Sequence, residues 1–241
     1  MKYNLHRSAA PELMDDLHCS GPVVERTLRE LDFINRTLGG NRITIDGVFR
    51  LIGDAGPDDP VLHIADLGCG SGDMLRRIAT RARKLGIPLR LTGIDANPFI
   101  IEYARQKSAG FPEIEFRVAD VRSDDFGRER FDVITCTLFL HHFSMDELAR
   151  LLDGFARQVR VGVVINDLHR HWLAFHSIRI LTSLFSRSAM VCYDAPLSVL
   201  RSFTRSDWTA LFHRAGITGF ELRWRWAFRW QAIVYAPAAG R

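Results

Sequence analysis

Three glycines in the stretch ADLGCGSGDML, residues 65–75, stand at alternating positions directly after an apolar run. Gly68, Gly70 and Gly72 remove side chains where the chain would turn from a strand into a helix. A ligand could therefore approach the backbone amides at the helix N-terminus. The spacing G-x-G-x-G differs from the G-x-G-x-x-G of dinucleotide pyrophosphate sites. Asp66, just before the turn, would repel a pyrophosphate but suits a cationic ligand.

Two further acidic residues end the next two apolar segments. Asp95, in GIDAN, comes about twenty residues after the glycine turn, where a carboxylate can accept both hydroxyls of a ribose. Asp120 and Val121, in VADV, could hold an amino group and pack against the face of an adenine ring. Each acid alone could merely end a strand, but all three features together predict a nucleoside-type ligand.

A regular alternation of strands and helices must position these residues. The pattern predicts strands at 61–68, 89–95, 114–120, 131–137 and 161–167, with helices at 72–85, 98–108 and 144–158. Ser144 and Glu147 form a capping box at the start of the last of these helices. This alternation is typical of a parallel sheet with helices on both faces, whose ligands bind beyond the carboxyl ends of the strands.

The C-terminal third predicts two helices and a hairpin. Residues 172–185 have a broad apolar face, which favours either a lid over a lipophilic ligand, a membrane-contacting helix, or an ordinary core helix. A helix at 205–216 is predicted to have Ser206 as its N-cap. Residues 217–237 predict an antiparallel hairpin in which alternation turns Trp224 and Trp226 into the core.

Four segments together resemble motifs of the class I S-adenosylmethionine-dependent methyltransferases: IADLGCGSGDML, LTGIDANP, RVADV and FDVITCTLFLHHF. The resemblance is close over residues 61–164 and loose over the C-terminal third. It implies a Rossmann-like, doubly wound α/β fold with a mostly parallel seven-stranded sheet, an antiparallel C-terminal hairpin and an N-terminal helical cap. The cofactor implied is S-adenosylmethionine. The implied cofactor contacts are Asp66, Gly68, Cys69, Gly70, Gly72, Asp95, Ala96, Asp120, Val121, Thr137 and His142.

The expected organisation is a helical cap at residues 1–52 and a methyltransferase domain at residues 53–241, with a lid insertion at about 168–203. Residues 22–40 carry apolar side chains at helical spacing and end in two glycines, and residues 53–60 form a turn-rich linker. The cap is expected either to pack over the cofactor or to form a homodimer contact.

The candidate catalytic residues are His169, Asp167 and His142. Methyl transfer from a sulfonium needs an aligned acceptor, and a phenol also gains from a base such as histidine. Asp167 and His169, two residues apart, could face the same way as an orienting carboxylate and a base. Alternatively, Asp167 caps the next helix and His169 is solvated or packed, while His142 forms a wall of the pocket. No metal is predicted, because the His169–His171 pair lacks further ligands.

The bulk composition is that of a cytoplasmic globular protein. Four scattered cysteines favour reduced thiols, and the sequence contains neither a secretory signal nor a membrane-spanning run. Residues 170–241 hold ten arginines and no lysine against three acidic residues, a net charge of +7. This asymmetry could signal a polyanionic partner, but the absence of a dense basic run favours scattered, solvated arginines.

The sequence therefore predicts an enzyme that methylates oxygen or carbon of a small, lipophilic aromatic, quinol or polyketide-type acceptor. A tRNA or rRNA methyltransferase is the alternative, suggested by the basic C-terminal third. The segment after residue 137 lacks the proline motif of adenine amino-methyltransferases, and no nucleic-acid-binding module is apparent. A third reading, a non-catalytic binding protein, fits poorly with the glycine turn and Asp95.

Overall fold

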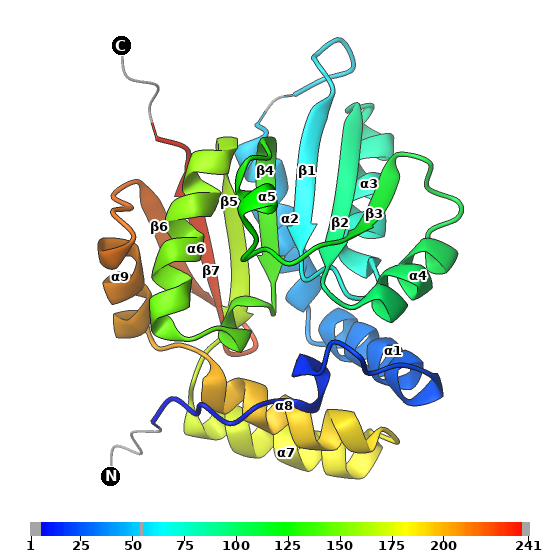
Figure 1. The fold of residues 1–241 in the computed structure, drawn as a ribbon, viewed down its shortest axis with the longest axis vertical. Coiled ribbons are helices and arrows are strands. Elements are labelled where there is room, and N and C mark those ends of the chain that lie inside the picture. Colours follow the sequence, from blue (N-terminus) through cyan, green and yellow to red (C-terminus); the bar gives the residue numbers. More distant parts are fainter. Residues whose placement is uncertain (1–5, 54, 238–241) are drawn as a thin grey trace.

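The computed structural model describes residues 6–53 and 55–237. A seven-stranded sheet runs through it in the order β3-β2-β1-β4-β5-β7-β6 (Figure 1). Neighbouring strands are parallel from β3 to β5, whereas β7 is antiparallel to both β5 and β6. The strands are β1 (Leu62–Leu67), β2 (Leu89–Asp95), β3 (Ile114–Val118), β4 (Phe131–Thr137), β5 (Val159–Leu168), β6 (Phe220–Arg225) and β7 (Arg229–Tyr235). This is the fold class that the sequence predicted.

Helices cover both faces of the sheet and form two apolar cores. One core packs against α2 (Gly40–Leu51), α3 (Asp73–Leu85) and α4 (Pro98–Lys107). The other packs against α5 (Asp124–Gly127), α6 (Met145–Gln158) and α9 (Arg205–Arg214). In α2, a Cβ on Gly47 would lie 2.6 Å from the Val164 side chain, so glycine lets this helix lie directly on β5.

Local sequence signals placed most element boundaries correctly. Strands β2 and β4 have the predicted bounds, and the Ser144 capping box is present at the start of α6. The cap predicted for α9 was wrong, because Thr204 and not Ser206 is the N-cap. Thr204 forms a reciprocal capping box with Asp207, while the hydroxyl of Ser206 lies 2.8 Å from that of Thr204.

The C-terminal hairpin formed as predicted, but its tryptophans do not face the core. Trp224 is 46% exposed and Trp226 is 73% exposed. Trp226 falls in the turn between the strands, outside the alternation of β6. Trp224 lies at the end of that edge strand, whereas Phe220 at the other end is covered by α9, 4.5 Å from the Phe212 ring centroid. The alternation of residues along a strand could not show how much of β6 helix α9 would cover.

The remaining helices lie at the carboxyl ends of the parallel strands, in the lower part of Figure 1. They are the short η1 (Leu13–Asp15) and η2 (Leu140–His142), together with α1 (Pro22–Thr37), α7 (Trp172–Phe185) and α8 (Ala189–Arg201). Leu184 and Phe185 of α7 are 69% and 78% exposed, so α7 is not an ordinary core helix. Among the described residues, no helix has the length and apolarity needed to cross a membrane.

The predicted cap, residues 1–52, contains two different kinds of helix. Helix α1 lies over the strand ends, whereas α2 packs on the sheet itself. The first five residues of the expected cap, and Asp54 in the expected linker, lie outside the described residues. The division therefore stays a proposal.

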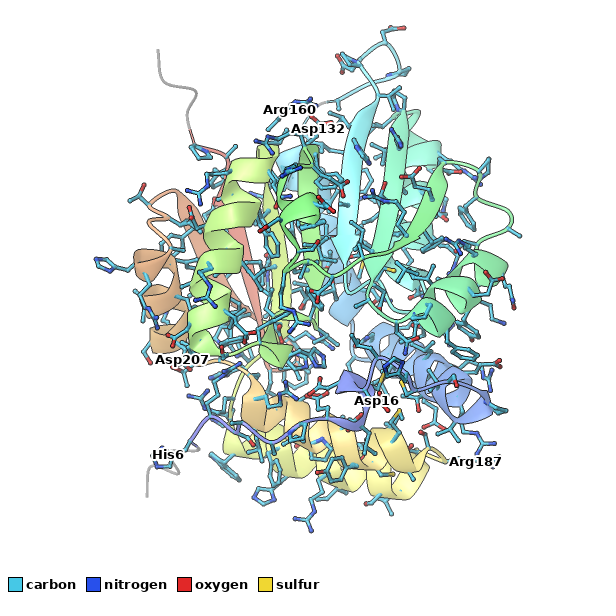
Figure 2. All side chains as sticks on the ribbon, viewed as in Figure 1. His6, Asp16, Asp132, Arg160, Arg187 and Asp207 are labelled. Atoms are coloured by element: carbon cyan, nitrogen blue, oxygen red, sulfur yellow. The ribbon has the colours of Figure 1, made fainter. Side chains whose placement is uncertain are left out.

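The arginines of the C-terminal third are scattered among separate partners. Arg170 lies 2.9 Å from Asp207, and Arg214 lies 2.5 Å from Asp146. Figure 2 places Asp207 and Arg187 at opposite sides of the lower part of the molecule. This distribution indicates that the arginines are scattered and do not form a single basic surface.

Candidate functional site

A cavity of about 650 Å³ lies at the carboxyl ends of the strands. Its lining comes from the loop after β1, the ends of β2 to β4, the helices α1, α7 and α8, and the turn before β7. All but one of the predicted cofactor contacts line it: Asp66, Gly68, Cys69, Gly70, Asp95, Ala96, Asp120, Val121, Thr137 and His142. The exception is Gly72, the N-cap of α3, where a Cβ would lie 2.7 Å from the Phe116 ring.

The glycine loop presents bare backbone to this cavity. Gly68 and Gly70 have φ values of +67° and +51°, which strongly favour glycine. A Cβ on Gly68 would lie 2.2 Å from the Phe139 ring, whereas a Cβ on Gly70 would meet only Leu28, at 3.8 Å. Gly68 is therefore needed for packing, and Gly70 leaves room for a ligand.

Asp95 lies at the base of the glycine loop with free acceptor capacity. One carboxylate oxygen accepts from the Asn97 amide at 3.0 Å, and the other from the Gly70 amide at 3.3 Å. Burial raises the pKa of this carboxyl group. Two carboxylate oxygens offer about four lone-pair positions, so Asp95 can accept two more hydrogen bonds, as a ribose diol requires.

Asp120 is less free than the sequence suggests. Both of its carboxylate oxygens accept hydrogen bonds from the Arg122 guanidinium, at 2.7–3.0 Å. These bonds hold the pKa of Asp120 below its ordinary value. An adenine amino group at this position would have to share the carboxylate with Arg122.

Three other carboxyl groups lining the cavity have raised pKa values. Burial raises the pKa of Glu12 to about 7, of Asp32 to about 6 and of Asp66 to about 7. The Ser71 hydroxyl donates to Asp32 at 2.7 Å, and the Thr135 hydroxyl donates to Asp66 at 2.6 Å. A bound cation would favour the charged forms of these acids, so the cavity suits a positively charged ligand.

The histidine that pairs with Asp167 is His141, not His169. His141 Nδ1 lies 2.7 Å from Asp167 Oδ1, and both side chains are buried. Asp167 also accepts from the backbone amides of Leu140, His141 and Leu168. Burial alone would raise the pKa of Asp167, but His141 and these bonds hold it below its ordinary value.

His169 lies outside the cavity lining. Its Nδ1 accepts from the Trp224 indole at 3.2 Å, and its ring packs edge-on against Trp230. Burial lowers the pKa of His169 to about 4. His169 directly follows β5 and forms a β-bridge with Phe203, but its side chain contacts Trp224 and Trp230 and not Asp167. The alternative role for Asp167, capping the next helix, was also wrong, because His171 is the N-cap of α7.

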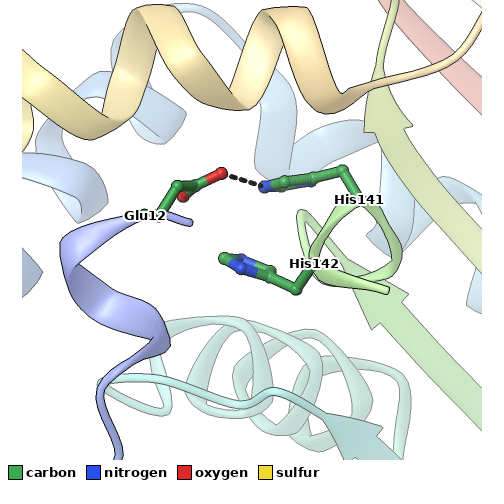
Figure 3. Close-up of side chains that lie close together, drawn as sticks. All are labelled: Glu12, His141 and His142. Atoms are coloured by element: carbon green, nitrogen blue, oxygen red, sulfur yellow. Dashed lines mark ion pairs between the residues drawn. The ribbon is translucent and has the colours of Figure 1, made fainter. Parts of the chain in front are cut away.

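Two histidines in the loop after β4, His141 and His142, lie against the N-terminal segment that carries Glu12 (Figure 3). His142 Nδ1 lies 2.6 Å from Asp15 Oδ1, and His141 Nε2 lies 3.7 Å from Glu12 Oε1. Glu12, His141 and His142 offer ligand atoms within 4.8 Å of one another, a group that could hold a metal ion. However, the Arg201 guanidinium already lies 3.7 Å from Glu12 and 2.5 Å from Asp15. That fixed cation would repel a metal ion bound at this cluster.

Two non-glycine residues with positive φ also line the cavity. Leu138, directly after β4, has φ +53°, and Phe228, directly before β7, has φ +55°. Such backbone is costly for side chains with a Cβ and tends to cluster at functional sites. Neither residue was singled out for strain from the sequence, because no glycine marks these turns.

The strand order, the glycine loop after β1 and the acid at the end of β2 define a Rossmann-like methyltransferase fold. Residues 64–162 match a family described as "Methyltransferase domain". This match and the fold confirm the resemblance of this part of the chain to the class I S-adenosylmethionine-dependent methyltransferases.

Curated relatives at moderate identity are quinone methyltransferases. The chain is 31% identical over 142 residues to a 2-phytyl-1,4-naphtoquinone methyltransferase of Nostoc sp., covering 56% of this chain and 57% of the relative. It is 28% identical over 105 residues to the ubiquinone/menaquinone biosynthesis C-methyltransferase UbiE of Campylobacter jejuni, covering 43% of each chain. The chain therefore spans about half the length of these relatives.

Solved structures extend the similarity over most of the fold. A methyltransferase for plantazolicin, BpumL, solved with S-adenosylhomocysteine, has a TM-score of 0.65 at 17% identity and covers 88% of this chain and 89% of its own. A SAM-dependent methyltransferase from Aquifex aeolicus has a TM-score of 0.61 at 14% identity, covering 88% of this chain and 97% of its own. At these identities the similarity establishes the fold.

Proposed function

We propose that this chain binds S-adenosylmethionine in the cavity and transfers its methyl group to a small lipophilic acceptor of aromatic, quinol or polyketide type. The carrying observation is that the cavity has two chemically different sides. The glycine-loop side presents Asp66, Asp95 and bare backbone. The lid side, formed by α7 and α8, is mainly apolar and is lined by Ala174, Ile178, Leu181, Val191, Ala195 and Val199, with Ser177, Asp194 and Ser198 as its polar residues.

The residues of the first side fit the cofactor. Asp95 has the acceptor capacity for two ribose hydroxyls, and Gly70 leaves space beside its backbone. Asp66, held by Thr135, would favour a cationic amino group. When bound, the cofactor supplies a methyl group on a cationic sulfur. A nucleophile can attack the methyl carbon, and the sulfur then leaves as a neutral thioether. The chain's contribution is then to align the acceptor and exclude water.

We further propose His141 as the group that takes the proton released by the acceptor. With Nδ1 bonded to Asp167, the proton is accepted at Nε2, on the side of Glu12. A carboxylate in this position fixes the ring and stabilises the charged imidazolium. His142 and Asp15 form a second pair of the same kind at the wall of the cavity.

The lid helix α7 and the names of the relatives both support a lipophilic acceptor. The relatives' names specify quinones and naphthoquinones, which are lipophilic molecules with aromatic reduced (quinol) forms. The outer face of α7 exposes Ile180, Leu184 and Phe185, which supports contact with a membrane surface in which such an acceptor would dissolve. All four cysteines are free, in keeping with the proposed cytoplasmic location.

The test is a methyl-transfer assay with labelled S-adenosylmethionine. The acceptors offered are a short-chain 1,4-naphthoquinol, simple phenols with and without a ring carboxylate, a polyketide thioester and bulk tRNA. We expect labelled product from one of the small aromatic or polyketide acceptors and none from tRNA, with loss of product in the Asp95→Asn variant. Methylation of tRNA alone, or failure to bind S-adenosylhomocysteine by calorimetry, would overturn the proposal.

The buried acids also predict how cofactor binding depends on pH. Glu12 and Asp66 have pKa values of about 7 without ligand, and a bound cation should lower them. Binding of S-adenosylmethionine should therefore release protons and tighten as the pH rises from about 5.5 to about 8. S-adenosylhomocysteine keeps the amino group that faces Asp66 but lacks the sulfonium charge, so its binding should respond less to pH.

The measurement is the ratio of the two dissociation constants across this pH range, since ionisation of the amino group common to both ligands cancels in the ratio. Calorimetry in buffers of different ionisation enthalpy would count the protons released. A ratio that does not change with pH would show that these acids do not sense the sulfonium.

A further inference from the structure

A buried arginine with unpaired nitrogens lines the cavity. Arg229, the first residue of β7, is only 2% exposed. Its Nη2 donates to Asn35 Oδ1 at 2.8 Å. No acceptor among residues 6–53 and 55–237 bonds its Nε or Nη1. A buried group of this kind is costly unless something else completes its hydrogen bonds.

Arg229 also lacks a counter-ion within contact. No described carboxylate lies within 4.0 Å of its guanidinium, although such pairs are numerous elsewhere in the chain. Burial lowers its pKa to about 10, and the charge of Asp167 opposes this shift. The oxygens of Asp167 are taken up by His141 and three backbone amides. Arg229 thus remains a cation at neutral pH without a paired anion.

The surrounding chain is shaped to hold this guanidinium in place. A Cβ on Gly40 would lie 2.7 Å from Arg229 Cζ, so glycine at the start of α2 leaves the space that the side chain occupies. The Gly40 carbonyl is held by the Asn166 amide at 2.8 Å. Asn35 of α1 fixes the other side of the guanidinium. A long, flexible side chain is therefore immobilised with most of its donors unused.

The position of β7 in the sheet separates Arg229 from the expected cofactor contacts. Most of those contacts follow β1, β2 and β3, and Thr137 and His142 lie at the end of β4 and in the loop after it, whereas β7 lies beyond β5. With strands about 4.8 Å apart, β7 is roughly 14 Å from β1. The neighbouring turn, 226–228, lines the same cavity from this side. An anion bound here would belong to the half of the cavity that the cofactor leaves for the acceptor.

We propose that Arg229, together with Asn35, binds a carboxylate of the methyl acceptor, so that the acceptors of this chain are acids. A planar guanidinium with free N–H groups matches a carboxylate in shape and charge. The inference rests on the proposed methyltransferase function and narrows its acceptor class. The cofactor also carries a carboxylate, so the experiment must separate the two sources.

The experiment is calorimetry with four probes on the full chain and on Arg229→Gln. Two probes report the cofactor side: S-adenosylhomocysteine, and 5′-methylthioadenosine, which lacks the amino-acid carboxylate. The other two, titrated in the presence of S-adenosylhomocysteine, are 1-hydroxy-2-naphthoate and 1-naphthol, which differ only by a carboxylate. The control variant is Arg223→Gln, an exposed arginine on the same hairpin.

We expect the wild-type chain to prefer the naphthoate over the naphthol. Arg229→Gln should weaken naphthoate binding roughly 10- to 100-fold and leave the other three probes unchanged. Weaker binding of S-adenosylhomocysteine but not of methylthioadenosine would assign Arg229 to the cofactor and overturn the proposal. Equal affinities of the two naphthalene probes in the wild type would also overturn it, even if the variant fails to fold. Absence of S-adenosylhomocysteine binding would instead contradict the proposed function itself.

Discussion

Replacing Asp95 with asparagine should weaken the binding of S-adenosylhomocysteine by about 10- to 100-fold. The carboxylate has one protein hydrogen bond on each oxygen and faces the cavity, which leaves it free to accept both ribose hydroxyls. Asparagine keeps one oxygen for the Asn97 amide but replaces the other with a donor. The loss should appear directly in the dissociation constant measured by calorimetry, with little change in the thermal unfolding midpoint.

Asp120→Asn is the matched control for this experiment. Asp120 also ends a strand segment and lines the cavity, but its carboxylate is already occupied by Arg122. Its replacement should have a smaller effect on affinity than the change at Asp95. Equal effects of the two variants, or unchanged affinity in Asp95→Asn, would remove the ribose from its proposed place.

Replacing His141 with glutamine should lower kcat by about 100-fold, within the range typical of a lost general base. The amide of glutamine can still donate to Asp167, so the buried carboxylate need not lose its partner. Affinity for S-adenosylhomocysteine should stay close to that of the wild type, because none of the expected cofactor contacts is removed. The measurement is kcat and KM with an accepted substrate, alongside calorimetry to show an intact cofactor site.

His169→Ala separates the structural assignment from the sequence-based one. His169 was the base predicted from its spacing to Asp167, but it packs against Trp224 and Trp230 outside the cavity lining. We therefore expect kcat to change little in this variant. A large loss of turnover in His169→Ala together with an active His141→Gln enzyme would reverse the assignment.

The sheet and its glycine loop could be predicted because their signals are local. Apolar runs of strand length, the glycines at 68, 70 and 72, and the capping box at Ser144 each depend on residues within a few positions of one another. Asp95 follows the same logic, because a residue at the end of a parallel strand must lie at the ligand edge. Ten of the eleven predicted cofactor contacts consequently line the cavity.

The part of the cavity around Glu12, His141 and Arg229 could not be predicted in this way, because distant segments build it. Glu12 meets His141, and Arg229 meets Asn35, across more than a hundred residues of sequence. The pairing of Asp167 failed for a related reason. The spacing of two residues favoured His169 as the partner of Asp167. In the fold, the loop after β4 lies beside the end of β5, so His141 pairs with Asp167 instead. The buried state of Arg229 is invisible in a sequence where arginines are common and mostly exposed.

The N-terminal segment has a consequence for the order in which the protein folds. Arg7 donates to the carbonyls of Arg201 and Phe143, and Asp194 accepts from the amides of Leu13 and Met14. Contacts of such long sequence separation form late, because much chain entropy must be lost before they add any stability. On the ribosome, residues 7–15 emerge before α8 and must wait for it before they can dock. Strands β1 to β4 and the glycine loop can assemble earlier. The glycine-loop side of the cavity can therefore form during synthesis before the side that needs α8.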